Sequence, residues 1–110
     1  MEIDLTKLVE TLSDVSENDL NSWLDARDQN ESFESRWIEA HESSPDMNHR
    51  YGDGEILHSM IWDATNGHEI TLRVVEDFDL IDCYTSRGLE HPFVASLMEM
   101  YLVGVFPLPN

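Results

Sequence analysis

Two short groups of side chains in this sequence of 110 residues have the types that catalysis and metal binding require. The first is His49, Arg50, Tyr51 and Asp53. A histidine can act as a general base and an arginine can stabilise negative charge, which is how a nuclease or phosphodiesterase would use such a group. Loops are rich in the same residue types without any catalysis, so a structural role is the stronger interpretation.

The second group is acidic and consists of Glu76, Asp77, Asp79 and Asp82. Carboxylates of this kind bind Mg²⁺ or Ca²⁺ through their oxygen atoms. On a strand, Asp77 and Asp79 share one face while Asp82 points to the other, so the three cannot converge on one ion. The spacing also lacks the glycine and the closing glutamate of an EF-hand loop. We therefore expect a charged, solvated sheet edge here and no metal ion.

A third group consists of acidic residues that recur every three or four positions in the predicted helices. Residues at this spacing lie about 5–6 Å apart on one helix face. Phosphates on a nucleic-acid duplex have a similar spacing, with one charge per roughly 3.4 Å of each strand. These acids and two aromatic residues are the candidate partner-binding residues: Glu10, Asp14, Glu17, Asp25, Asp28, Glu31, Glu34, Glu39, Glu42, Trp62 and Tyr51.

The net charge of the chain is −17, from 23 acids and six bases. Residues 1–44 carry twelve acids and three bases, and residues 45–110 carry eleven and three, so the two parts have net charges of −9 and −8. The acidity is therefore a property of the folded body and not of a tail. Such a protein repels nucleic acid and anionic membrane surfaces, and it attracts basic proteins.

The composition predicts one cytoplasmic globular domain over residues 1–110. Three Trp, four Phe and three Tyr argue against disorder. No segment approaches the roughly 20 apolar residues of a membrane span, and the N-terminus lacks the basic start of a signal peptide. The single cysteine, Cys83, excludes an internal disulfide and suits a reducing compartment.

The helices that would position the acidic residues lie in the first 42 residues. Leu5, Leu8, Val9 and Leu12 have helical spacing, which predicts a helix over Asp4–Leu12. Ser16, with Asp19 three residues later, resembles a capping box at the start of a second helix that runs to about Asp28. A third helix is capped by Asn30 or Ser32 and ends at Glu42, before Pro45. The following loop, Ser43–Gly54, is long, and such loops are often functional.

Asn66-Gly67 is the strongest short-range hairpin signal in the sequence. Runs rich in Ile, Val, Thr and Trp flank it, so we expect two antiparallel strands over Glu55–Asp63 and His68–Glu76. A third strand over Phe78–Thr85 completes a meander. After it, Pro92 begins a helix that is apolar nearly all round and ends before Gly104. The predicted fold is α+β: two or three N-terminal helices, a three-stranded antiparallel β-meander, and a buried C-terminal helix against the sheet.

The leading functional hypothesis is a non-enzymatic inhibitor that binds a basic, nucleic-acid-handling protein and blocks its nucleic-acid site. Two settings share this physics: a DNA mimic directed against restriction or CRISPR machinery, and an immunity protein for a nuclease toxin. The alternative is a small regulatory or structural subunit that pairs through its apolar C-terminal helix, with itself or with another protein. In that case the acidity has no part in the function. An enzyme that uses His49–Asp53 is the third hypothesis. No motif indicates a catalytic residue, a metal ion or a cofactor.

Overall fold

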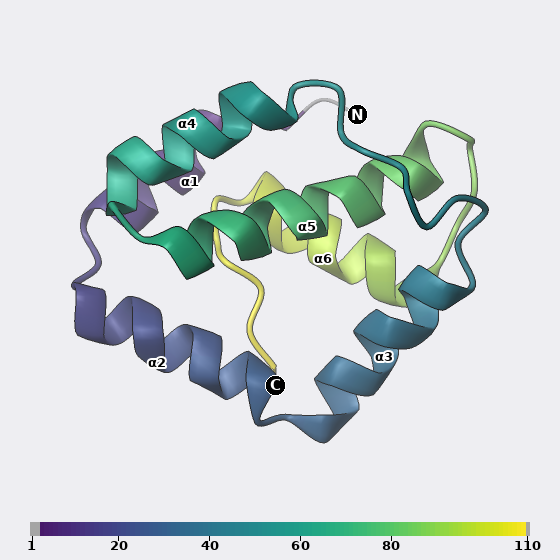
Figure 1. Cartoon of the computed structure of the whole chain (residues 1–110), viewed down its shortest axis with the longest axis horizontal. Helices are drawn as coiled ribbons and strands as arrows, with labels where there is room; N and C mark the ends of the chain where they lie inside the picture. Colours follow the sequence, from purple (N-terminus) through teal and green to yellow (C-terminus); the bar gives the residue numbers. More distant parts are fainter. Residues whose placement is uncertain (1–2, 110) are drawn as a thin grey trace.

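The computed structural model describes residues 3–109, and this part of the chain contains six helices and no strand (Figure 1). The predicted α+β fold with its three-stranded meander is therefore wrong, because the two predicted strands and the third run are helical. The helices, in chain order, are α1 (Leu5–Ser13), α2 (Glu17–Asp28), α3 (Glu31–Glu42), α4 (Gly54–Thr65), α5 (His68–Thr85) and α6 (Pro92–Leu102).

Asn66-Gly67 joins two antiparallel helices instead of two strands. Asn66 is left-handed, with φ 52° and ψ 24°, and its N–H donates to the Trp62 carbonyl at 2.7 Å, which ends α4. Gly67 has φ −109° and begins α5. A type I′ hairpin turn needs positive φ at both residues, but here only Asn66 has it. Asparagine tolerates the left-handed region at a helix end as well as in a hairpin.

The spacing of the buried residues after Gly67 shows why this segment is a helix. Ile70, Val74, Phe78 and Ile81 are all buried, and their spacings of four, four and three residues put them on one face of α5. On a strand the same residues would be divided unevenly between two faces. The β-branched content of the run suggested a strand, but strand and helix propensities are weak compared with tertiary packing.

The structure confirms the predicted N-terminal helices. Each begins at a side chain that accepts a hydrogen bond from the first turn: Asp4 from the Thr6 N–H at 2.9 Å, Ser16 from Asp19 at 3.2 Å, and Asn30 from Phe33 at 2.8 Å. The last helix also lies where it was predicted, with Pro92 in its first turn and Gly104 just beyond its end.

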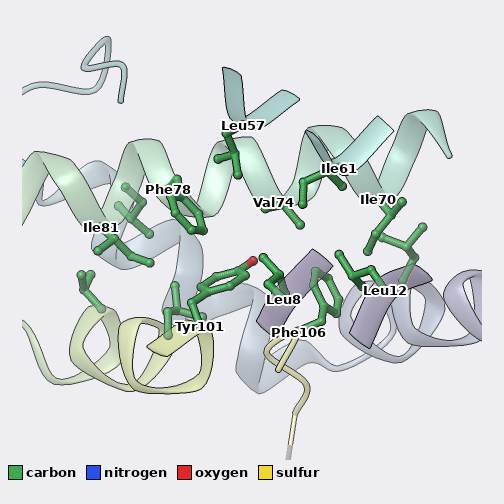
Figure 2. Close-up of a cluster of buried hydrophobic side chains, with 14 of the residues drawn as sticks. Leu8, Leu12, Leu57, Ile61, Ile70, Val74, Phe78, Ile81, Tyr101 and Phe106 are labelled. Atoms are coloured by element: carbon green, nitrogen blue, oxygen red, sulfur yellow. The ribbon is translucent and has the colours of Figure 1, made fainter. Parts of the chain in front are cut away.

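Helix α5 runs through the middle of the molecule and organises the packing. Helix α4 lies along one side of it and α6 along another, while α1 packs on α4 and α2 contacts α5 from the side opposite α4 (Figure 1). Figure 2 shows the core that results: Leu57 and Ile61 of α4 point toward α5, and Leu8 and Leu12 of α1 join the same cluster. With no sheet to cover, α6 buries Phe93, Val94, Leu97 and Tyr101 against α5 and α3. None of the described helices combines the length and the apolarity that crossing a membrane requires.

Candidate partner-binding surfaces

The nine acids predicted to bind a partner lie on or beside α1, α2 and α3, and three of them have a basic partner within the chain. Asp28 pairs with Arg73 at 2.7 Å, and the same guanidinium lies 3.9 Å from Glu34. Glu39 accepts hydrogen bonds from Ser43 and His91, both at 2.9 Å, and these bonds lower its pKa. These three carboxylates contribute to tertiary structure by tying α2 and α3 to α5 and to the start of α6.

The other six predicted acids are exposed, and no ion pair among the described residues involves them; they are Glu10, Asp14, Glu17, Asp25, Glu31 and Glu42. Glu17 and Glu31 lie in the first turns of α2 and α3, where a negative charge interacts favourably with the helix dipole. Part of the acidity therefore stabilises the helices, and the rest is available to an external partner.

The basic side chains do little to offset this surface, because tertiary structure uses most of them. Arg27 is buried, while Arg50, Arg73 and Arg87 each lie within 4.0 Å of a carboxylate. Arg36 lies over the ring of Phe93, 5.0 Å from its centroid. The unpaired charge that remains at the surface is consequently overwhelmingly negative.

The two predicted aromatic residues lie elsewhere, at α4. Trp62 is on α4 and its side chain is 39% exposed. Tyr51 precedes α4 and is partly buried, with its ring 5.4 Å from that of Phe78. Helix α4 and the pair α2–α3 lie on opposite sides of α5 in Figure 1. The acids of α2 and α3 therefore lie on a different surface from Tyr51 and Trp62. Glu10 and Asp14 belong to α1 and its C-terminal end, and α1 packs on α4.

The acidic residues Glu76–Asp82 were predicted to form a sheet edge, and this prediction is wrong. They lie on α5, where Asp79 and Asp82 hold the loop 43–53 in place. Asp79 accepts a hydrogen bond from the Tyr51 N–H at 2.7 Å and lies 3.9 Å from Arg50. Asp82 contacts His49 at 2.7 Å. Of the side chains proposed for an enzyme, His49, Arg50 and Tyr51 thus have structural contacts. Among the described residues no group of acids, histidines and cysteines has the geometry to hold a metal ion.

A hollow of about 430 Å³ lies between α3, this loop and α5, lined by residues that include Trp37, Met47, Glu76 and Asp79. Desolvation raises the pKa of Glu76 above its ordinary value. Burial also raises the pKa of Asp79, with the Tyr51 N–H and Arg50 opposing the shift in part. Both carboxylates are consequently less stable in their charged form than a fully solvated acid, and the effect on Glu76 is the smaller because its side chain is exposed.

Asp77, placed by prediction at the same sheet edge, is fully buried and pairs with Arg27. Its two oxygens accept from the Arg27 guanidinium at 2.7 and 2.9 Å, from the Trp37 ring at 3.0 Å, and from the Tyr101 hydroxyl at 2.5 Å. Burial alone would lower the pKa of Arg27, but the Asp77 charge beside it raises it above its usual value. Burial, followed by the Asp77 charge, raises the pKa of Tyr101 well above 10.0, so its hydroxyl stays protonated.

Sequence reasoning missed this network, although a signal for it was present. Asp77 is three residues after Val74 and four before Ile81, and Arg27 is three after Leu24, so helical spacing places both charges on buried faces. Two opposite charges on the buried faces of two helices predict an ion pair between them.

The model of one protein family, described as immunity protein PIM1, matches residues 2–108. No curated protein and no solved structure matches the chain.

Proposed function

The chain belongs to the PIM1 family of immunity proteins, and we propose that it neutralises its partner toxin by covering a basic, nucleic-acid-handling surface of that toxin. Family membership implies that the partner is a toxin protein. The proposal adds the chemistry of the contact, namely a surface rich in lysine and arginine such as the substrate site of a nuclease.

One observation carries this proposal: the exposed carboxylates greatly outnumber the basic side chains that remain free to offset them. Arg27 is buried against Asp77, and Arg50, Arg73 and Arg87 lie beside acids of the same chain. Nucleases bind phosphates through positive charge. A protein with a net charge of −17 therefore complements the surface that such an enzyme presents to its substrate.

The charge would act first on the encounter. Electrostatic steering raises association rates from about 10⁵–10⁶ M⁻¹s⁻¹ to as much as about 10⁸–10⁹ M⁻¹s⁻¹ at low salt. Speed is useful to an immunity protein, because every unbound toxin molecule remains active. Once bound, the acidic surface occupies the positions of the phosphates, so the nucleic acid and the immunity protein compete for one site. We place this encounter in the cytoplasm, where the buried Cys83 stays reduced.

The family favours the immunity setting over the other hypotheses. A DNA mimic directed against restriction or CRISPR machinery stays a prediction from charge alone. The burial of Phe93, Val94, Leu97 and Tyr101 within the chain itself argues against a regulatory subunit that pairs through its C-terminal helix.

The experiment is capture of the toxin from a lysate of the source cell at low and at high salt. We expect a basic protein that is recovered far better at low salt and whose bound nucleic acid is displaced by this chain. The double variant Asp25→Asn, Glu31→Gln removes two exposed, unpaired charges and should slow association and flatten its salt dependence. Ser32→Ala, exposed on α3 and uncharged, is the matched control.

Three results would overturn the proposal. One is failure to recover any basic protein at low salt. Another is a ternary complex in which the toxin holds nucleic acid and this chain together. The third is an unchanged association rate when Asp25 and Glu31 are both replaced by lysine.

A further inference from the structure

The side of α4 that points away from the core combines apolar and acidic residues. Leu57 and Ile61 are fully buried and define the inner face of the helix. Ile56 and Trp62 fall outside that face and are 60% and 39% exposed. Glu55 and Asp63 are also exposed, and α4 contains no lysine or arginine.

The surface around Ile56 is hollowed on two sides. One hollow, of about 560 Å³, extends toward the start of α1 and is lined in part by Ile3 and Leu5. The other, of about 850 Å³, extends toward α5 and is lined in part by Val75. Tyr51, Asp53 and Ile56 line both. An exposed apolar side chain beside hollows of this size has the form of a protein-binding surface, because a partner can fill the hollows on either side.

We call this surface the α4 face; it is formed by Tyr51, Asp53, Glu55, Ile56, Trp62 and Asp63. We infer that the α4 face binds a segment of the toxin in which apolar residues alternate with lysines and arginines. The inference rests on the proposed function and deepens it. Charge complementarity selects this occupant: the α4 face carries three carboxylates beside an isoleucine and two aromatic rings, and Arg50, which also lines the hollow toward α5, lies 3.9 Å from Asp79. The partner therefore needs apolar groups with cations near them.

A second copy of the chain is a poor occupant of the same surface. A symmetric dimer through the α4 face would place Glu55 and Asp63 of both copies close together, and each copy carries a net charge of −17. The repulsion opposes self-association, while the same charges favour a basic partner.

The position of the α4 face separates two roles. The unpaired acids of α2 and α3 lie on the other side of α5 (Figure 1). Charges outside a contact act mainly on association, whereas well-packed aromatic and apolar anchors act mainly on dissociation. The acids of α2 and α3 therefore speed association with the toxin, and Ile56 and Trp62 slow its dissociation.

The test uses the toxin that copurifies with the full chain, purified and immobilised, and measures both rate constants for each variant. Trp62→Ala should raise the dissociation rate by at least about 30-fold, the factor that corresponds to a hot-spot loss of about 2 kcal/mol. Ile56→Ala should raise it by at least about 5-fold, the factor for about 1 kcal/mol. Val103→Ala is the matched control, because Val103 is 62% exposed and apolar but lies beyond the end of α6; it should change the rate less than 2-fold. Melting temperatures of all three variants should stay near that of the wild type.

The outcomes distinguish this inference from the proposed function. Dissociation rates of Trp62→Ala and Ile56→Ala equal to that of Val103→Ala would overturn the α4 face, while salt-dependent association would still support the proposed function. Association indifferent to salt and to the Asp25→Asn, Glu31→Gln variant would overturn the proposed function instead. A dimer of the free chain in sedimentation that Trp62→Ala dissolves would assign the α4 face to a second copy and also overturn the inference.

Discussion

The buried ion pair between Arg27 and Asp77 makes the sharpest stability prediction. Asp77→Ala removes the acceptor of four hydrogen bonds, two from Arg27 and one each from Trp37 and Tyr101. Arg27 then remains 2% exposed with no counter-ion, between the rings of Phe33 and Phe106 at 4.7 and 5.0 Å. An arginine guanidinium keeps its proton in proteins, so Arg27 cannot escape the cost by becoming neutral.

The expected loss is large compared with the stability of a domain of this size. Breaking a buried pair by removing one partner costs about 3–5 kcal/mol, out of a total of about 5–15 kcal/mol. At about 4 °C per kcal/mol, the melting temperature should fall by at least about 12 °C. The assay is urea unfolding followed by tryptophan fluorescence, together with a thermal scan.

Two further variants make the reasoning refutable. Asp25→Asn removes an exposed carboxylate from the same helix as Arg27 and should change the free energy of unfolding by less than about 0.5 kcal/mol. The double variant Arg27→Met, Asp77→Leu removes both charges and should recover part of the loss, since apolar replacements of buried pairs are often neutral. The rest of the loss stays because Trp37 and Tyr101 lose their acceptor. A loss below about 1 kcal/mol for Asp77→Ala would refute the claim that Asp77 compensates a buried charge.

Three more predictions follow from single features. Gly104→Ala should lower stability by more than about 1 kcal/mol in urea unfolding, because φ is +76° and the new Cβ would lie 2.5 Å from the Lys7 Cβ. Gly88→Ala, with φ +67° and open space, should cost less. Glu76→Gln should raise the melting temperature at pH 7. The pKa of Glu76 is raised in the folded state, so the folded protein loses stability as the pH rises through that pKa and the carboxyl becomes charged. In melts recorded over a pH series, the gain should vanish below about pH 4, where the carboxyl is protonated in both states. Added NaCl should raise the melting temperature of the free protein by screening like charges, and an insensitive melt would contradict that picture.

The middle of the chain shows how far sequence reasoning reaches. The segment from Glu55 to Thr85 carries two conflicting signals, β-branched residues with an Asn-Gly turn, and buried positions at helical spacing. The second signal was correct because Ile70, Val74, Phe78 and Ile81 can all enter one core only on a helix. Local propensity is worth a few tenths of a kcal/mol per residue, and burying those four side chains is worth several kcal/mol in total.

The sequence by itself determined the features that depend on neighbouring residues or on composition alone. Net charge is a sum over side chains, and the caps at Ser16 and Asn30 are bonds within one helical turn, so both could be predicted directly. Tertiary structure decided the rest. Arg27 meets Asp77 across 50 residues, and Tyr51, whose N–H donates to Asp79 of α5, lines the same hollow as Ile56. Long-range contacts depend on how the helices pack around α5, and that packing is a property of the whole chain.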